Sequence, residues 1–164
     1  MGAALPWITA VLLAAAAYAV GGMRRRPLRG TEPPWKTVLL VADPELGGVP
    51  LQALHVATRL VGPGGVLHVL APVRLPLAVP LEAPAGEETE RAAALLDQVE
   101  RVAGSSGVAV LSHLRRGRAV RSMLREAVRK VGADAVIVQC PPHQWSELAA
   151  EIAPAQAVVV PADG

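Results

Sequence analysis

An uncharged stretch from Leu5 to Met23 constrains this chain more than any other feature, because three consecutive arginines follow it: Arg24, Arg25 and Arg26. As a helix that rises about 1.5 Å per residue, these 19 residues span roughly 28 Å, close to the hydrocarbon thickness of a bilayer. Trp7 and Tyr18 lie toward the two ends of the stretch, where amphipathic rings favour the membrane–water interface. We therefore predict a transmembrane anchor with a basic flank over residues 1–26.

A secretory signal peptide is the alternative, and it carries its positive charge before the apolar core rather than after it. Ala17-Tyr18-Ala19 nevertheless resembles a cleavage site and leaves removal of residues 1–23 open. Because Lys and Arg stay on the cytoplasmic side, the basic flank predicts a single pass through the inner (cytoplasmic) membrane with the domain on the cytoplasmic side. We also expect this flank to contact anionic lipid headgroups.

The charges of the chain are unevenly divided. Residues 1–36 carry five basic and one acidic residue, a net charge of +4, whereas residues 37–164 carry eleven basic and thirteen acidic residues, a net charge of −2. The basic excess therefore belongs to the anchor. With no Phe and one Tyr, the chain also lacks the aromatic platform that single-stranded nucleic acids stack on, so we predict no nucleic-acid partner.

Beyond the anchor, the chain alternates between strand and helix patterns. Residues 27–35 form a linker, because the prolines and glycine of PLRGTEPP preclude a continuous helix. Residues 36–164 have the length of one domain with one core. Apolar runs predict buried strands, and apolar residues three or four apart predict helices. The predicted strands cover residues 36–42, 66–72, 108–114, 135–139 and 157–160; the predicted helices cover 49–61, 87–103, 119–131 and 145–152; residues 73–86 form a Pro-rich loop.

This alternation predicts an α/β fold with a parallel sheet and helices on both faces. In such sheets ligands bind beyond the carboxyl ends of the strands, where the strand order reverses. The loops that follow the first and fourth strands are therefore the places to look for a ligand site.

Five short segments mark the ends or the interiors of the predicted strands. The first strand ends in Asp43, the second reads Leu67-His68-Val69, Gly117 follows the third, and the last two read Ala133-Asp134-Ala135-Val136-Ile137-Val138 and Ala157-Val158-Val159-Val160-Pro161. In this order and spacing, the segments resemble the universal stress protein family over nearly all of residues 36–161. The resemblance implies a five-stranded parallel sheet in the order 3-2-1-4-5. It also implies homodimers through the last strand.

Some members of that family bind ATP through a Gly-x-x-Gly motif and a later Gly-Ser/Thr after the fourth strand. This chain departs there, since Pro141 and Pro142 remove two backbone donors and no glycine lies between Gly132 and Gly164. We expect no phosphate cradle of the family type and no bound cofactor. Asp43, as an adenine or ribose partner, and Gly117 are the candidate cofactor-binding residues. Asp43-Pro44 also favours a turn, and that interpretation of Asp43 is the one we prefer.

Arginines flank Gly117 and continue along the helix predicted after it at spacings of three and four, so the helical ones share one stripe. Guanidinium groups match phosphate and carboxylate geometry, so these residues are our candidate anion- or partner-binding surface. The alternative is that these arginines only form a solvated helix face, and we prefer that interpretation to a binding surface. The candidates are Arg115, Arg116, Arg118, Arg121 and Arg125.

The sequence shows no catalytic or metal-binding constellation. Cys140 is the only cysteine, which excludes an intramolecular disulfide and a cysteine-rich zinc site, and the histidines lack ligand spacing. A catalytic thiol needs a base and an activating environment, and only His143 is near in sequence. We therefore predict that the chain is not an enzyme. A hydrolase or redox enzyme acting through Cys140 is the disfavoured alternative.

Together these features predict a non-catalytic, membrane-tethered regulatory or accessory domain, such as a subunit of a transporter or another membrane complex. Its predicted partners are membrane lipid and an integral membrane protein. The main alternative is a nucleotide-responsive sensor that binds an adenine nucleotide in an altered mode, through Asp43 and the arginines at 115–118.

Overall fold

The computed structural model describes residues 35–46, 48–84, 86–139, 149–150 and 152–160. The predicted anchor and linker lie outside these residues, and with them Trp7, Tyr18, Arg24, Arg25 and Arg26. Within the described residues, no helix has the length and hydropathy needed to cross a membrane. The predicted span over residues 5–23 lies outside the described residues, so this finding does not concern it.

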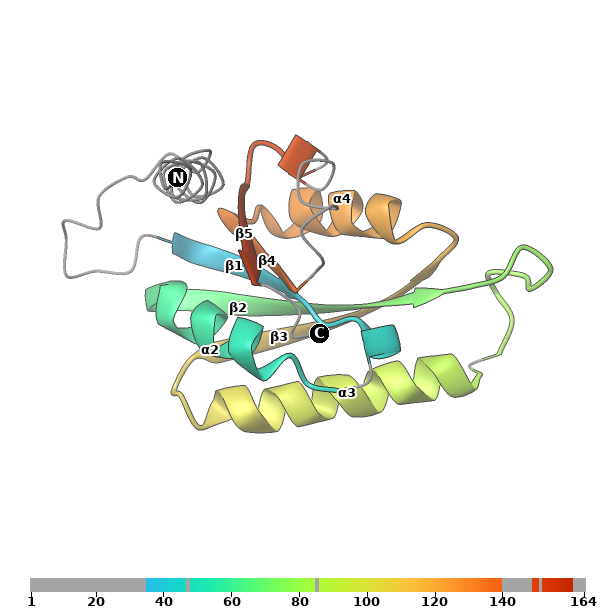
Figure 1. Ribbon diagram of the computed structural model, residues 1–164, viewed down its shortest axis with the longest axis horizontal. Coiled ribbons are helices and arrows are strands. Elements are labelled where there is room, and N and C mark those ends of the chain that lie inside the picture. The colour runs from blue at the N-terminus through green and yellow to red at the C-terminus, as the bar shows by residue number, and fades with distance from the viewer. Residues whose placement is uncertain (1–34, 47, 85, 140–148, 151, 161–164) are drawn as a thin grey trace, which may run out of the picture. The chain divides into compact units, whose positions relative to one another are not determined.

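The described strands form a parallel sheet in the order β3-β2-β1-β4-β5 (Figure 1). This order is the one that the family resemblance implies, and the α/β architecture predicted from the sequence is confirmed. The central strand is β1, which pairs in parallel with β2 on one side and with β4 on the other. The strands are β1 (Trp35–Val41), β2 (Val61–Arg74), β3 (Ala109–Gly117), β4 (Ala135–Gln139) and β5 (Gln156–Val160).

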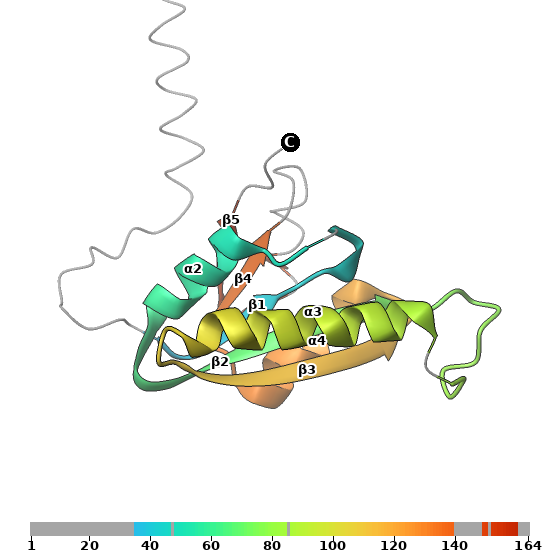
Figure 2. The same ribbon diagram turned by 90° about the horizontal axis from the view of Figure 1, so that it is seen from below.

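Helices cover both faces of the sheet (Figures 1 and 2). Since successive strand side chains alternate between faces, Val69 packs in the core under α2 and α3, whereas Leu70 packs in the core under α4. Both side chains are fully buried. The helices are the short 3-10 helix η1 (Pro44–Leu46), α2 (Leu51–Leu60), α3 (Glu87–Gly104) and α4 (Val120–Val131). Of the predicted helix at 145–152, Ala149 and Ala150 are helical, and residues 145–148 and 151 lie outside the described residues.

Strand β2 is twice as long as predicted, and both of its extensions have a physical cause. At its start, Trp35 pairs with Val61 and Thr37 with Val66, so the glycine-rich segment 62–65 forms an irregularity in the strand instead of a loop. A Cβ on Gly65 would lie 2.7 Å from the carbonyl oxygen of Lys36, so only glycine fits against β1 there. At its end, β2 keeps pairing with β3 beyond the point where β1 stops.

The overhang of β2 and β3 positions the candidate site. Val41, the last residue of β1, pairs with Leu70, whereas β2 and β3 continue together to the pair of Arg74 and Gly117. The backbone N–H of Leu75 then donates to the carbonyl oxygen of Gly117 at 2.8 Å. The carboxyl edge of the sheet is therefore stepped, with β2 and β3 forming a ledge beyond the end of β1.

Candidate functional site

Asp43 lies just after β1, at the carboxyl edge where the sequence predicts a ligand site. Its Oδ1 accepts the backbone N–H of Glu45 at 2.9 Å. This contact closes a turn of the kind that Asp before Pro favours, and η1 begins at Pro44. The carboxylate therefore has a structural role at the start of the loop, and it is only half-buried.

The arginines around Gly117 do not converge on one point, because strand alternation sends neighbours to opposite faces. Arg115 faces α4, where its Nη2 lies 3.6 Å from the carboxylate of Glu126. Arg116 faces α3, and its Nη2 donates to the carbonyl oxygen of Pro84 at 3.5 Å. Arg118 donates from Nη1 to the carbonyl oxygens of Leu75, at 3.4 Å, and of Pro76. Two of the three candidates therefore bind the loop after β2.

Packing within the domain explains why position 117 is a glycine. A Cβ built on Gly117 would lie 2.9 Å from both Cγ and Sδ of Met123, a buried residue in the first turn of α4. Its carbonyl oxygen also accepts the N–H of Leu75. Both contacts are internal, and they explain a glycine here without a nucleotide.

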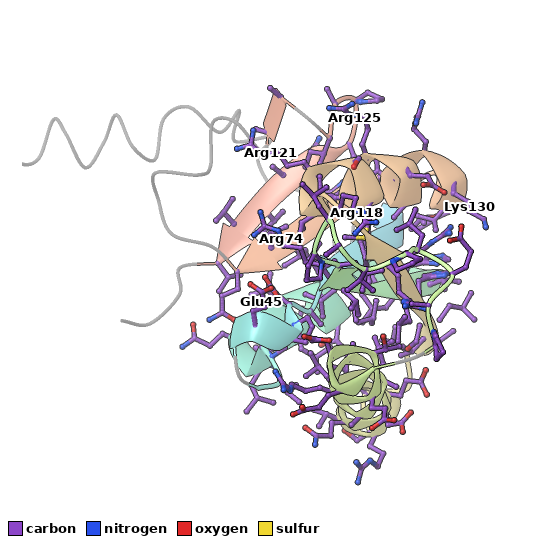
Figure 3. The ribbon with its side chains drawn as sticks, turned by 90° about the vertical axis from the view of Figure 1, so that its right-hand side faces the viewer. Glu45, Arg74, Arg118, Arg121, Arg125 and Lys130 are labelled. Atoms are coloured by element: carbon purple, nitrogen blue, oxygen red, sulfur yellow. The ribbon has the colours of Figure 1, made fainter. Side chains whose placement is uncertain are left out.

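The predicted arginine stripe runs along the exposed side of α4. Arg121 and Arg125 are exposed, and the opposite side of the helix buries Met123, Leu124, Ala127 and Val128. The helix begins after Ala119 without a side-chain cap and ends at Val131; Gly132 follows it with a φ of 64°, which suits glycine. Figure 3 shows Arg74 and Arg118 near each other, with Arg121 and Arg125 above them on the side of α4.

The segment after β4, where the family's phosphate loop would lie, falls outside the described residues, as do Cys140 and His143. Within the described residues, no group of three or more His, Cys, Asp or Glu side chains could hold a metal ion. In the same part of the chain, no polar or charged residue is buried as a whole, although Oγ of Ser112 and Nε of Arg116 are buried atoms without a hydrogen-bond partner. The chemistry available at the described carboxyl edge is therefore that of exposed guanidinium groups and one turn-forming carboxylate.

A histidine pair was not anticipated from the sequence. His68 on β2 and His113 on β3 both face α4, and Nδ1 of His68 lies 2.8 Å from Nε2 of His113. The rings are nearly parallel, at 10°, with centroids 5.1 Å apart. This centroid distance matches two rings set edge to edge around a shared hydrogen bond. Burial, and then the charge of His113, lowers the pKa of His68; burial, then Arg115 and Lys130, lowers the pKa of His113.

The pair could have been found only with the strand register. Leu70 pairs with His113 and His68 with Leu111, so the two histidines are diagonal neighbours on one face of the sheet. The two histidines are 45 residues apart in the sequence, so no local pattern brings them together. A hydrogen bond between two imidazoles needs one donor and one acceptor, so both rings cannot be protonated in this arrangement. The pair therefore favours neutral or singly protonated histidines.

No protein-family model and no curated protein sequence matches the chain. A universal stress protein family member from Burkholderia pseudomallei matches its structure with a TM-score of 0.57 and 20% identity, over 77% of this chain and 96% of that one. A family member from Arabidopsis thaliana, solved with AMP bound, gives 0.58 and 10%, over 79% and 93%.

A universal stress protein solved in complex with cAMP matches with a TM-score of 0.50 and 16% identity, over 77% of this chain and 96% of that one. The matched span agrees in length with the domain described above. At these identities the likeness concerns the fold and carries no ligand across. The domain after the predicted anchor has the universal stress protein fold.

Proposed function

We propose that this chain is a non-catalytic, membrane-tethered regulatory or accessory protein that acts through a partner in the membrane. The observation that carries the proposal is the state of the carboxyl edge. Asp43, the nucleotide contact suggested by the family resemblance, closes its own turn, and Gly117 accommodates Met123. Arg116 and Arg118 bind carbonyl oxygens of the chain itself. The residues expected to serve a small ligand therefore already serve the fold.

The sequence supports the tether and the partner. The stretch from Leu5 to Met23 is long enough to span a bilayer, and its alanine-rich composition makes it only marginally apolar. A marginal span gains from packing against a neighbouring helix, where small residues allow close approach. We infer that residues 5–23 dock against an integral membrane protein, such as a transporter subunit, and place the domain beside it.

Extraction of native membranes with a mild detergent tests the proposal. The chain should elute in a complex that contains one integral membrane protein at fixed stoichiometry. A variant with Leu12→Arg and Leu13→Arg, which puts two charges at the centre of the span and so opposes its insertion, should lose that protein. A chain that elutes alone would contradict the partner claim, and a complex unchanged by the variant would contradict docking through the span.

A nucleotide-responsive sensor is the second candidate, and the cations at the carboxyl edge favour it. Arg74 is exposed there and makes no hydrogen bond or ion pair within the described residues. Arg118 lies beside it on the same edge (Figure 3). Calorimetric titration with AMP, ATP and cyclic dinucleotides tests this function. Saturable heat that Arg74→Ala abolishes would support it, and no response at millimolar nucleotide would remove it.

A further inference from the structure

The loop after β2 presents two leucines to solvent by a repeated turn. We call residues 75–84 the Pro-Leu loop. The N–H of Val79 donates to the carbonyl oxygen of Pro76, and the N–H of Ala83 to that of Pro80, both at 3.1 Å. Each turn therefore starts at a proline and places a leucine second. Leu77 is 88% exposed and Leu81 47% exposed.

Contacts at both ends of the Pro-Leu loop fix its shape. Leu75 is buried in the core under α2 and α3 and fixes the start of the loop. Arg118 binds the carbonyl oxygens of Leu75 and Pro76, and Arg116 binds that of Pro84 at the other end. Two arginines of one segment therefore clasp both ends of the loop. Compact loops with their ends tied together are frequently functional, and two presented leucines give this one an apolar tip.

Opposite charges border the loop on its two sides. Arg74 and Arg118 lie on the side of α4 (Figure 3). The other border is the first turn of α3, which carries Glu87, Glu88 and Glu90. Glu87 pairs with Arg91 at 3.0 Å, whereas Glu88 makes no hydrogen bond or ion pair within the described residues. The surface thus runs from basic through apolar to acidic.

We propose that the Pro-Leu loop is a self-association surface that binds a second copy of this chain about a twofold axis. In a twofold contact the same patch faces itself, so an axis that passes through the leucines at right angles to the line from the basic to the acidic border brings the basic border of one copy against the acidic border of the other. The leucines of the two copies then bury each other at the centre. An anionic bilayer would repel the acidic border, and Glu82 on the loop itself adds to that repulsion.

This contact is separate from the dimerisation through the last strand that the family resemblance implies. The loop follows β2 and β5 lies on the far side of β1 and β4 in the sheet, so the two surfaces can be tested independently. Two leucines and their borders make a small interface, which alone gives weak association. Confinement of copies to one membrane would raise their effective concentration and strengthen it.

Cysteine cross-linking of the full chain in liposomes tests the contact directly. Cys140→Ser removes the only native thiol. In that background Leu77→Cys should form a disulfide-linked dimer under mild oxidation, because residues near a twofold axis meet their own copies. Leu111→Cys is the matched control, since Leu111 is 52% exposed but lies on β3 outside the loop. We expect several-fold more dimer from position 77 than from position 111.

Charge reversal tests the predicted orientation. In the Leu77→Cys protein, Arg74→Glu and Glu88→Arg should each lower the yield of cross-linked dimer, and the two together should restore it. Both side chains are exposed, so the fold should be retained, which circular dichroism checks. Equal yields at positions 77 and 111 would overturn the proposal. A double reversal that fails to restore the yield would overturn the twofold arrangement and point to a different partner for the loop.

Discussion

At the scale of single residues, one aspartate ties together the amino ends of three strands through its side chain and its backbone. Oδ2 of Asp134 accepts the backbone N–H groups of Lys36, at 3.0 Å, and Thr37, at 2.9 Å. The backbone N–H of Asp134 donates to the carbonyl oxygen of Thr37, and the carbonyl oxygen of Asp134 accepts the backbone N–H of Gln156. Asp134 therefore joins β1, β4 and β5 at the edge opposite the candidate site. The aspartate in the family-like Ala133-Asp134 segment thus has a structural reason here.

Asp134→Ala should lower the free energy of unfolding by about 1–2 kcal/mol, because two charge-assisted hydrogen bonds are lost at an exposed site. Denaturant unfolding at neutral pH measures it. Asp97→Ala is the control, since Asp97 is an exposed helix residue whose side chain makes no hydrogen bond within the described residues. An equal, small effect at both positions would refute the role of Asp134 as a clamp.

Gly117→Ala should destabilise the domain by about 1 kcal/mol, because the new Cβ would crowd Met123 and a methionine yields only partly. In a Met123→Ala background the same change should cost nothing. Gly104→Ala is the matched control, since a Cβ there meets no atom within 4 Å. A cost at Gly117 that persists without Met123 would show that the glycine serves something other than packing.

At the scale of elements, the strand–helix alternation is readable from the sequence, because apolar runs and helical spacing are local patterns. The ends of the elements are less so. Residues 73 and 74 continue β2 only because β3 runs beside them, and nothing local in a Pro-rich segment announces that pairing. The same holds for the arginines at 115–118, which are adjacent in sequence but are sent to different faces by the pleat of β3. Adjacency in sequence predicted a cluster that the strand geometry disperses.

The histidine pair between β2 and β3 makes stability depend on pH. Both pKa values are lowered from the ordinary 6.5, mainly by burial, so the unfolded chain takes up protons before the folded one. The contribution is complete above about pH 6.5 and is lost as the pH falls through the lowered values. We expect the free energy of unfolding to drop between about pH 7.5 and pH 5.5, a range in which carboxylates hardly titrate.

A protein with His68→Gln and His113→Gln should lose most of this drop, whereas His55→Gln, at an exposed position on α2, should keep it. Denaturant unfolding at the two pH values provides the measurement for all three proteins. An unchanged drop in the double variant would assign the pH dependence to groups other than the pair.

At the scale of the whole molecule, we expect the predicted anchor to bind the membrane partner and the domain to be held beside that partner. The domain has the universal stress protein fold, and its described carboxyl edge engages Asp43, Gly117, Arg116 and Arg118 in internal contacts. Neither the fold nor that edge could have shown which partner the chain serves. The predicted span from Leu5 to Met23 is the feature on which the proposal of a membrane partner rests.

Two charges in the centre of the span should detach the chain from the membrane. Each arginine at the centre of a spanning helix costs about 2.5–3.5 kcal/mol, so Leu12→Arg with Leu13→Arg should move the protein out of the alkali-resistant membrane fraction. Ala93→Arg with Ala94→Arg, at two exposed positions of α3, should leave it there. Equal partitioning of the two variants would refute the anchor.

The mass and composition of the complex extracted from native membranes test the central claim most directly. The chain has a mass of 17.0 kDa, and native mass spectrometry resolves it from any assembly that contains it. We predict a complex in which this chain and one integral membrane protein occur at fixed stoichiometry, present with intact residues 5–23 and lost when Leu12 and Leu13 are replaced by arginine. A monomer, or an assembly of this chain with itself alone, would contradict it.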